Sequence, residues 1–260
     1  MSVQIVPGFS LTNRLILYAS LLLSPAQFVS GLGNPCPSNI GFLAYNLYTQ
    51  IAWHKAVTGD SDIHALSLIL PHFNLIYAVT YVGGVSSGSL IWGVPLGLGT
   101  TSVLILNTVS SWKAWAVHQP RGYGVYQFFF YGWRTIDEDF HKYLFLLWHI
   151  FDSLWCAGGI YMAIFLAITM SEVGKEARWY RTYLAIPLGS IGVLVFLAWP
   201  LILWTELIIA RNQIVSETDM TAVWLFVAQV VTMLIPKCIV DLSCFRGKEE
   251  PQDSDSTSVV

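Results

Sequence analysis

Residues 145–155, FLLWHIFDSLW, place two proton-exchanging groups inside a stretch apolar enough to lie in lipid. These groups are the imidazole of His149 and the carboxyl of Asp152. Because His149, Asp152 and Cys156 follow a spacing of three and then four residues, they share one stripe of a helix. We expect this stripe to face the interior of the protein, where a carboxyl beside an imidazole can act as a general acid or base.

Other polar side chains occur at a similar depth in neighbouring apolar segments. At ~1.5 Å per residue, they fall in the half of the bilayer next to the start of the first apolar segment, which we call face A. An ionisable group in hydrocarbon costs at least ~2.5 kcal/mol, so such groups should face one another or water. The sequence therefore predicts a polar cavity open toward face A. Its catalytic candidates are Asp152, His149 and Glu206, and its further lining candidates are His72, Asn107, Gln229 and Cys156.

These groups also have a structural interpretation. If Asp152 is a clamp hydrogen-bonded to His72 or His149, its role is limited to fixing the packing of the helices. Glu206, in the segment WTELIIAR, could extend toward Arg211 and the lipid headgroups. A function for the cavity therefore depends on how these side chains are paired.

The composition indicates a membrane protein. Of the 260 residues, 55% are hydrophobic and 11% are charged, and the mean hydropathy is +0.58. Soluble domains have about a quarter of their residues charged, so most of this surface should face lipid. The net charge of −3 and the scattered Lys and Arg residues exclude nucleic acid as a main partner. The expected partners are membrane lipids and a lipophilic small molecule.

Seven apolar segments approach the ~20 residues needed to cross a bilayer. They are Arg14–Leu32, Ile40–Val57, Ile63–Gly83, Ser89–Val109, Tyr143–Met170, Tyr183–Ala210 and Thr221–Leu242. The sequence thus predicts an all-α integral membrane protein, a seven-transmembrane-helix bundle formed by one multi-pass domain over residues 1–245. Six helices would remain if the first segment were a cleaved signal peptide.

Two segments are expected outside the helices. Residues 110–142 mix aromatic residues with charges and turn signals, which is typical of a loop lying in the membrane interface over the cavity mouth. Residues 246–260 are polar and acidic and should form a disordered tail. Cys244 beside Arg246 and Lys248 favours a cytosolic C-terminus.

Three classes of function fit these features. The first is an enzyme that acts on an isoprenoid- or lipid-like substrate by acid/base chemistry. The second is a proton-coupled transporter or a seven-helix receptor, of which a rhodopsin with Lys237 as the Schiff-base lysine is one version. The third is a haem protein with His72 and His149 as axial ligands. The four cysteines show no metal-binding spacing, and no cofactor is singled out.

Overall fold

The computed structural model of the chain describes residues 7–31, 37–59, 69–85, 90–118, 127–129, 131–135, 138–169, 184 and 186–234. This part of the chain is 87% helical and contains seven helices. The prediction of a mostly helical protein is therefore confirmed for the described residues. The acidic tail, Lys237, Cys36, Cys238 and Cys244 lie outside the described residues.

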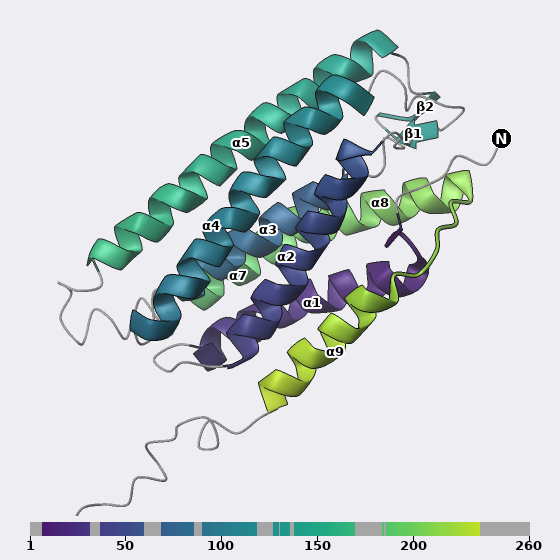
Figure 1. The fold of residues 1–260 in the computed structure, drawn as a ribbon. Coiled ribbons are helices and arrows are strands. Elements are labelled where there is room, and N and C mark those ends of the chain that lie inside the picture. Colours follow the sequence, from purple (N-terminus) through teal and green to yellow (C-terminus); the bar gives the residue numbers. More distant parts are fainter. Residues whose placement is uncertain are drawn as a thin grey trace, which may run out of the picture.

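The helices lie side by side, and consecutive ones run in opposite directions (Figure 1). The first four are α1 (Leu11–Gly31), α2 (Pro37–Thr58), α3 (Ile69–Val85) and α4 (Leu90–Lys113), which continues as the π-helix η2 (Ala114–His118). Then follow α5 (Glu138–Thr169), a continuous helical rod made of α7 (Ile186–Val193), the π-helix η4 (Leu194–Ala198) and α8 (Trp199–Asn212), and finally α9 (Met220–Leu234). Face A is the end at which α1, α3, α5 and α9 begin.

The segment expected as an interfacial loop is shorter than its predicted range of 110–142. Its first part continues α4 and η2 as far as His118, and α5 already begins at Glu138. Between them, β1 (Gln127–Phe129) and β2 (Trp133–Thr135) form an antiparallel hairpin. The hairpin turn contains Tyr131 and Gly132 with φ of 50° and 127°, and glycine adopts this left-handed region without strain.

The hairpin docks on the face A end of α8. The Asn212 side chain accepts a hydrogen bond from the Gln127 N–H and donates one to the Gln127 carbonyl, both at 2.8 Å. The Trp204 indole donates to the Phe129 carbonyl at 2.8 Å, and the guanidinium of Arg211 lies 5.3 Å from the Trp133 ring centre. The contact of this hairpin with a membrane surface stays a prediction.

Side-chain caps fix the face A ends of α1 and α9. Ser10 Oγ accepts the Asn13 N–H at 3.2 Å, and the Asp219 carboxylate accepts the N–H groups of Thr221 and Ala222. The Asn13 side chain also joins the two helices, because it donates to the Asp219 carbonyl and accepts the Asp219 N–H. The face A ends of α1 and α9 are therefore held in one register.

Close helix packing relies on two glycines of α2 and α4. A Cβ at Gly41 would lie 2.9 Å from the Gln229 Cα, so α2 and α9 approach closely only because this side chain is absent. A Cβ at Gly99 would lie 2.5 Å from a methyl of Leu43 on α2. The core of the bundle contains Phe42, Trp53 and Phe73, each at most 1% exposed.

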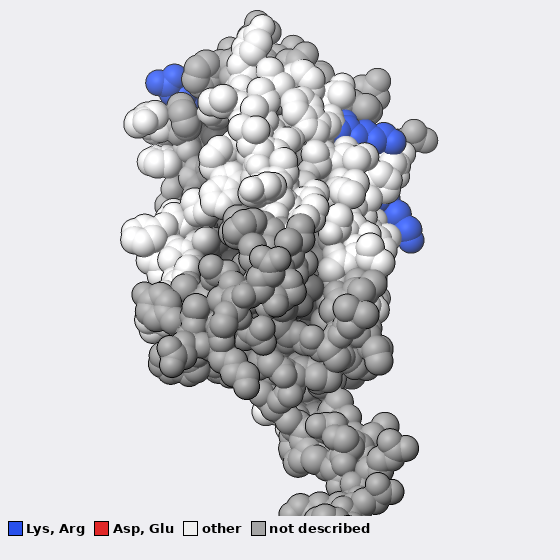
Figure 2. Space-filling model, turned by 90° about the vertical axis from the view of Figure 1, so that its left-hand side faces the viewer, with Lys and Arg blue, Asp and Glu red and all other residues white. Residues whose placement is uncertain are grey.

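Two described helices are long and apolar enough to cross a membrane. They are Tyr143–Tyr161 within α5, with a mean hydropathy of 1.3, and Ile191–Asn212, with a mean hydropathy of 2.2. Only 28% and 33% of these stretches are buried in the protein, so their apolar side chains mostly point outward. Figure 2 shows a face whose described surface is largely neutral, with Lys and Arg near its rims and no Asp or Glu in view.

Candidate functional site: a histidine–aspartate pair beside an apolar pocket

The acid of the FLLWHIFDSLW segment is paired with the histidine of α3. His72 Nδ1 lies 2.7 Å from Asp152 Oδ1, and the two side chains are 13% and 5% exposed. Both residues lie in apolar helices, so neither has bulk water as its main partner. A distance of 2.7 Å in such surroundings is that of a strong hydrogen bond with one proton between the two groups.

A third residue contacts the same imidazole nitrogen. The Trp148 indole donates to His72 Nδ1 at 2.9 Å, with the two rings nearly perpendicular at 88°. An imidazole nitrogen either donates or accepts, and an indole only donates. When Asp152 holds the proton, Nδ1 accepts the indole N–H of Trp148. When Nδ1 holds the proton, Nδ1 donates to Asp152 and the bond from Trp148 is lost. The position of one proton thus decides which neighbour His72 binds.

The His72 side chain also lines an open pocket, whose volume of about 280 Å³ includes space outside the protein surface. Leu75 and Ile76 of α3, Phe151 and Trp155 of α5, and Val193 and Leu197 of the α7–η4 rod complete its lining. Phe151 is 47% exposed and Trp155 is 37% exposed, which places the pocket on the outer flank of the bundle. The second ring nitrogen of His72, Nε2, has no hydrogen-bond partner among the described residues. Nε2 therefore has unused hydrogen-bonding capacity, while the pocket wall itself is apolar.

The π-helix that borders this pocket has a local cause. Pro200 has no N–H, and in a regular α-helix its ring would crowd the carbonyl of Phe196 four residues earlier. The preceding turn widens, and the Trp199 N–H bonds to the Leu194 carbonyl five residues back. Single π-turns within α-helices occur frequently at functional sites. Here the wide turn carries Leu197 into the pocket wall.

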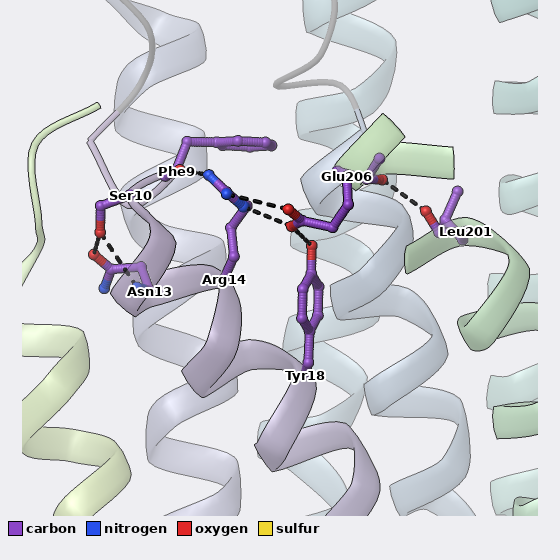
Figure 3. Close-up of polar contacts among 8 residues, drawn as sticks. Phe9, Ser10, Asn13, Arg14, Tyr18, Leu201 and Glu206 are labelled. Atoms are coloured by element: carbon purple, nitrogen blue, oxygen red, sulfur yellow. Dashed lines mark hydrogen bonds and ion pairs between the residues drawn. The ribbon is translucent and has the colours of Figure 1, made fainter. Parts of the chain in front are cut away.

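Glu206 lies in a different network, shown in Figure 3. Its carboxylate binds Arg14 of α1 through two hydrogen bonds, from Nε at 2.7 Å and from Nη2 at 3.2 Å. The Tyr18 hydroxyl donates to the same carboxylate at 2.6 Å, and Arg14 Nη1 donates to the Phe9 carbonyl at 2.6 Å. Glu206 thus faces Arg14 and not Arg211, whose Nε donates to Gln127. The network joins α1 to α8.

The remaining predicted site residues are divided among separate contacts. Gln50 donates to Asn107 at 3.3 Å, Ser20 donates to Gln229 at 3.1 Å, and the Cys156 thiol donates to the Leu104 carbonyl at 3.3 Å. His149 is 3% exposed, and its ring centre lies 6.2 Å from that of Trp112. Asp152 and His72 are therefore brought together, while Glu206 and Gln229 lie in contacts of their own.

Sequence reasoning did not identify Arg14, Tyr18 or Trp148 as parts of these networks. Arg14 carried a usable signal, because it is a lone charge near the start of an apolar segment and such a charge needs a partner. Trp148 had none, because a tryptophan in a membrane helix is commonly a packing or interface residue. Its role follows only from the geometry around His72.

No protein-family model, curated protein or solved structure matches the chain. A functional interpretation of the site therefore depends on its own geometry.

Proposed function

We propose that the protein is a multi-pass membrane protein, a bundle of seven transmembrane helices, that binds a lipophilic small molecule in the pocket beside His72 and acts on it by acid/base chemistry. The observation that carries this proposal is the His72–Asp152 pair, joined at 2.7 Å, on the wall of an apolar pocket. Burying a polar pair beside an apolar pocket lowers the free energy of unfolding, and an acid/base role explains why the pair is present.

The membrane assignment is supported by the surface of the helices. Leu147 and Leu154 of α5 and Phe196 of η4 are 65%, 67% and 78% exposed, beside two helices long enough to span a bilayer. In water such a surface would be an aggregation hazard, whereas in lipid it is the expected one. A pocket on this flank opens toward the acyl chains, so its occupant enters from the membrane.

The proposed chemistry uses both ring nitrogens of His72, because a proton gained at one nitrogen can be released at the other. When Nε2 takes a proton from the bound molecule, the Nδ1 proton can move to Asp152, so the pair holds no separated charges. The reverse transfer donates a proton from Nε2. The aromatic rings of Phe151 and Trp155 would stabilise a cation that develops on a protonated substrate. Asp152 acts here through His72 by taking up and returning the Nδ1 proton.

Proton-coupled transport is the alternative proposal. The same pair could take up and release a proton while a ligand moves through the bundle, without any covalent change in the ligand. The two functions differ in the fate of the bound molecule. An enzyme yields a new compound, and a transporter yields the same compound on the other side.

The test is mass spectrometry of lipophilic molecules that copurify with the protein in detergent, together with extracts of cells that express it. We expect a bound compound and, for an enzyme, a new product in the extracts. Val193→Trp should fill the pocket and abolish both. Leu203→Trp is the matched control, because Leu203 lies on the same rod, is 55% exposed and does not line the pocket. Equal binding by the two variants would contradict the assigned pocket, and a Soret band in the absorption spectrum would support the haem alternative.

A further inference from the structure

A group of buried polar side chains between α2, α3, α4 and α5 contains more hydrogen-bonding capacity than the described residues satisfy. The unpartnered atoms are Gln50 Oε1, Trp53 Nε1, Asn74 Nδ2, Asn107 Nδ2, Ser111 Oγ and both ring nitrogens of His149. None of these side chains is more than 3% exposed. We call these six residues the polar seam.

The outer part of the polar seam begins at face A. Trp53 and Thr49 of α2 line a second open pocket, whose lining includes the exposed Pro7. Thr49 donates to Asn74 Oδ1 of α3 at 3.2 Å. Gln50, one turn before Trp53, is next along the same helix. Polar atoms therefore extend from a pocket at face A into the bundle.

The inner part of the polar seam reaches α5. Gln50 donates to Asn107 of α4 at 3.3 Å, and Ser111 follows Asn107 by one helical turn. Trp112, the next residue, packs against the His149 ring at 6.2 Å. His149 lies one turn before Asp152 on the same face of α5. The seam thus passes from α2 through α4 to the helix that carries the acid.

Other approaches to Asp152 are apolar. The pocket on the flank of the bundle is lined by apolar side chains apart from His72. Toward face A, Trp148 stacks on Phe145 at 6.3 Å and contacts Trp204 at 5.6 Å. A group that gains or loses a proton in each cycle must exchange it with water. On these two sides, the described polar contacts come from the indole N–H groups of Trp148 and Trp204, which only donate.

The unpartnered atoms match what internal water binds. A buried polar atom without a partner costs ~1–3 kcal/mol, and a water molecule that makes two to four hydrogen bonds removes that cost. Gln50 offers an acceptor, Asn74 and Asn107 offer donors, and Ser111 offers both. Alternating donors and acceptors of this kind hold water molecules in a connected file.

We propose that the polar seam binds a file of water molecules that conducts protons between face A and Asp152. Each water takes up one proton and releases another, so the net result is one proton moved to or from the Asp152 carboxyl. The inference deepens the proposed function, because it names the route by which the His72–Asp152 pair is recharged from water. It applies equally to an enzyme and to a proton-coupled transporter.

The test measures hydrogen exchange at the indole of Trp148, which bonds to His72. Protein labelled with ¹⁵N-tryptophan is moved into D₂O in nanodiscs, and the loss of each indole N–H signal is followed by NMR. Gln50→Leu/Asn107→Leu removes both partners of one seam hydrogen bond, so little strain is expected. Exchange at Trp148 should slow by about tenfold or more, because D₂O then reaches the pair only when the bundle opens.

Two controls make the result specific. Ser20→Ala/Gln229→Leu removes an equally buried polar pair between α1 and α9, outside the polar seam, and should leave Trp148 exchange unchanged. The Trp204 indole, bonded to Phe129, should exchange at one rate in all proteins. Gln50→Met replaces the double variant if that variant does not fold.

Unchanged Trp148 exchange in a folded seam variant would overturn the water file. The measurement needs no substrate, so its outcome is independent of the proposed function. Failure of the proposed function would appear instead as unaltered binding and product formation in Val193→Trp.

Discussion

The Arg14–Glu206 pair and the His72–Asp152 pair differ in how many of their donor and acceptor atoms have a hydrogen-bond partner. Arg14 binds the carboxylate through two nitrogens and the Phe9 carbonyl through the third, and Tyr18 adds a further bond to Glu206. In the other pair, one nitrogen of His72 is shared by Asp152 and Trp148, and the second has no hydrogen-bond partner among the described residues. Each nitrogen of the Arg14 guanidinium has a partner, whereas Nδ1 of His72 can change partners. A saturated network holds helices together, and an unsaturated one can exchange protons.

The largest expected effect on stability concerns the saturated pair. Glu206→Leu leaves the Arg14 guanidinium, 10% exposed, without a carboxylate. Removing one partner of a buried ion pair costs ~3–5 kcal/mol, and the 36% exposure of Glu206 favours the lower end, about 3 kcal/mol. Reversible unfolding in mixed detergent measures this loss. A loss below ~1 kcal/mol, the usual value of an exposed pair, would show that the network is not a structural clamp.

A smaller effect is expected when one hydrogen bond of the same network is removed. Tyr18→Phe keeps the ring and its packing on Phe73 at 5.9 Å but removes the donor to Glu206. Arg14 still neutralises the carboxylate, so the free energy of unfolding should fall by about 1 kcal/mol. The same unfolding assay is used. If Tyr18→Phe lowered the free energy of unfolding as much as Glu206→Leu, the Tyr18 hydroxyl and not the ion pair would hold the two helices together.

The sequence predicts the helices and the common stripe of Asp152 and Cys156 because apolar runs and helical spacing are local properties. It also predicts that His72 and Asp152 lie at similar depth. It does not predict which polar groups pair, because Arg14 and Glu206 meet only through the packing of α1 on the rod that contains α7, η4 and α8. The wide turn before Pro200 follows from the proline, but its place beside the pocket depends on tertiary structure.

The smallest effect on stability is expected in the unsaturated pair. Asp152→Asn keeps the size of the side chain and a hydrogen bond to His72 Nδ1, so the free energy of unfolding should change by less than ~1 kcal/mol. Asp152→Leu, which leaves His72 without this partner, should cost ~1–3 kcal/mol in the same unfolding assay. An Asn variant as unstable as the Leu variant would indicate that the carboxylate charge itself holds α3 to α5.

The most direct test compares Asp152→Asn with Glu206→Gln in one assay of product formation and unfolding, with cell extracts analysed by mass spectrometry. Asp152→Asn should reduce product formation by about a hundredfold or more while the protein unfolds like the wild type, because a titrating acid is lost. Glu206→Gln should unfold more easily and still form product. Full product formation by a normally folded Asp152→Asn protein would contradict the account and leave His72 and Asp152 as a second structural clamp.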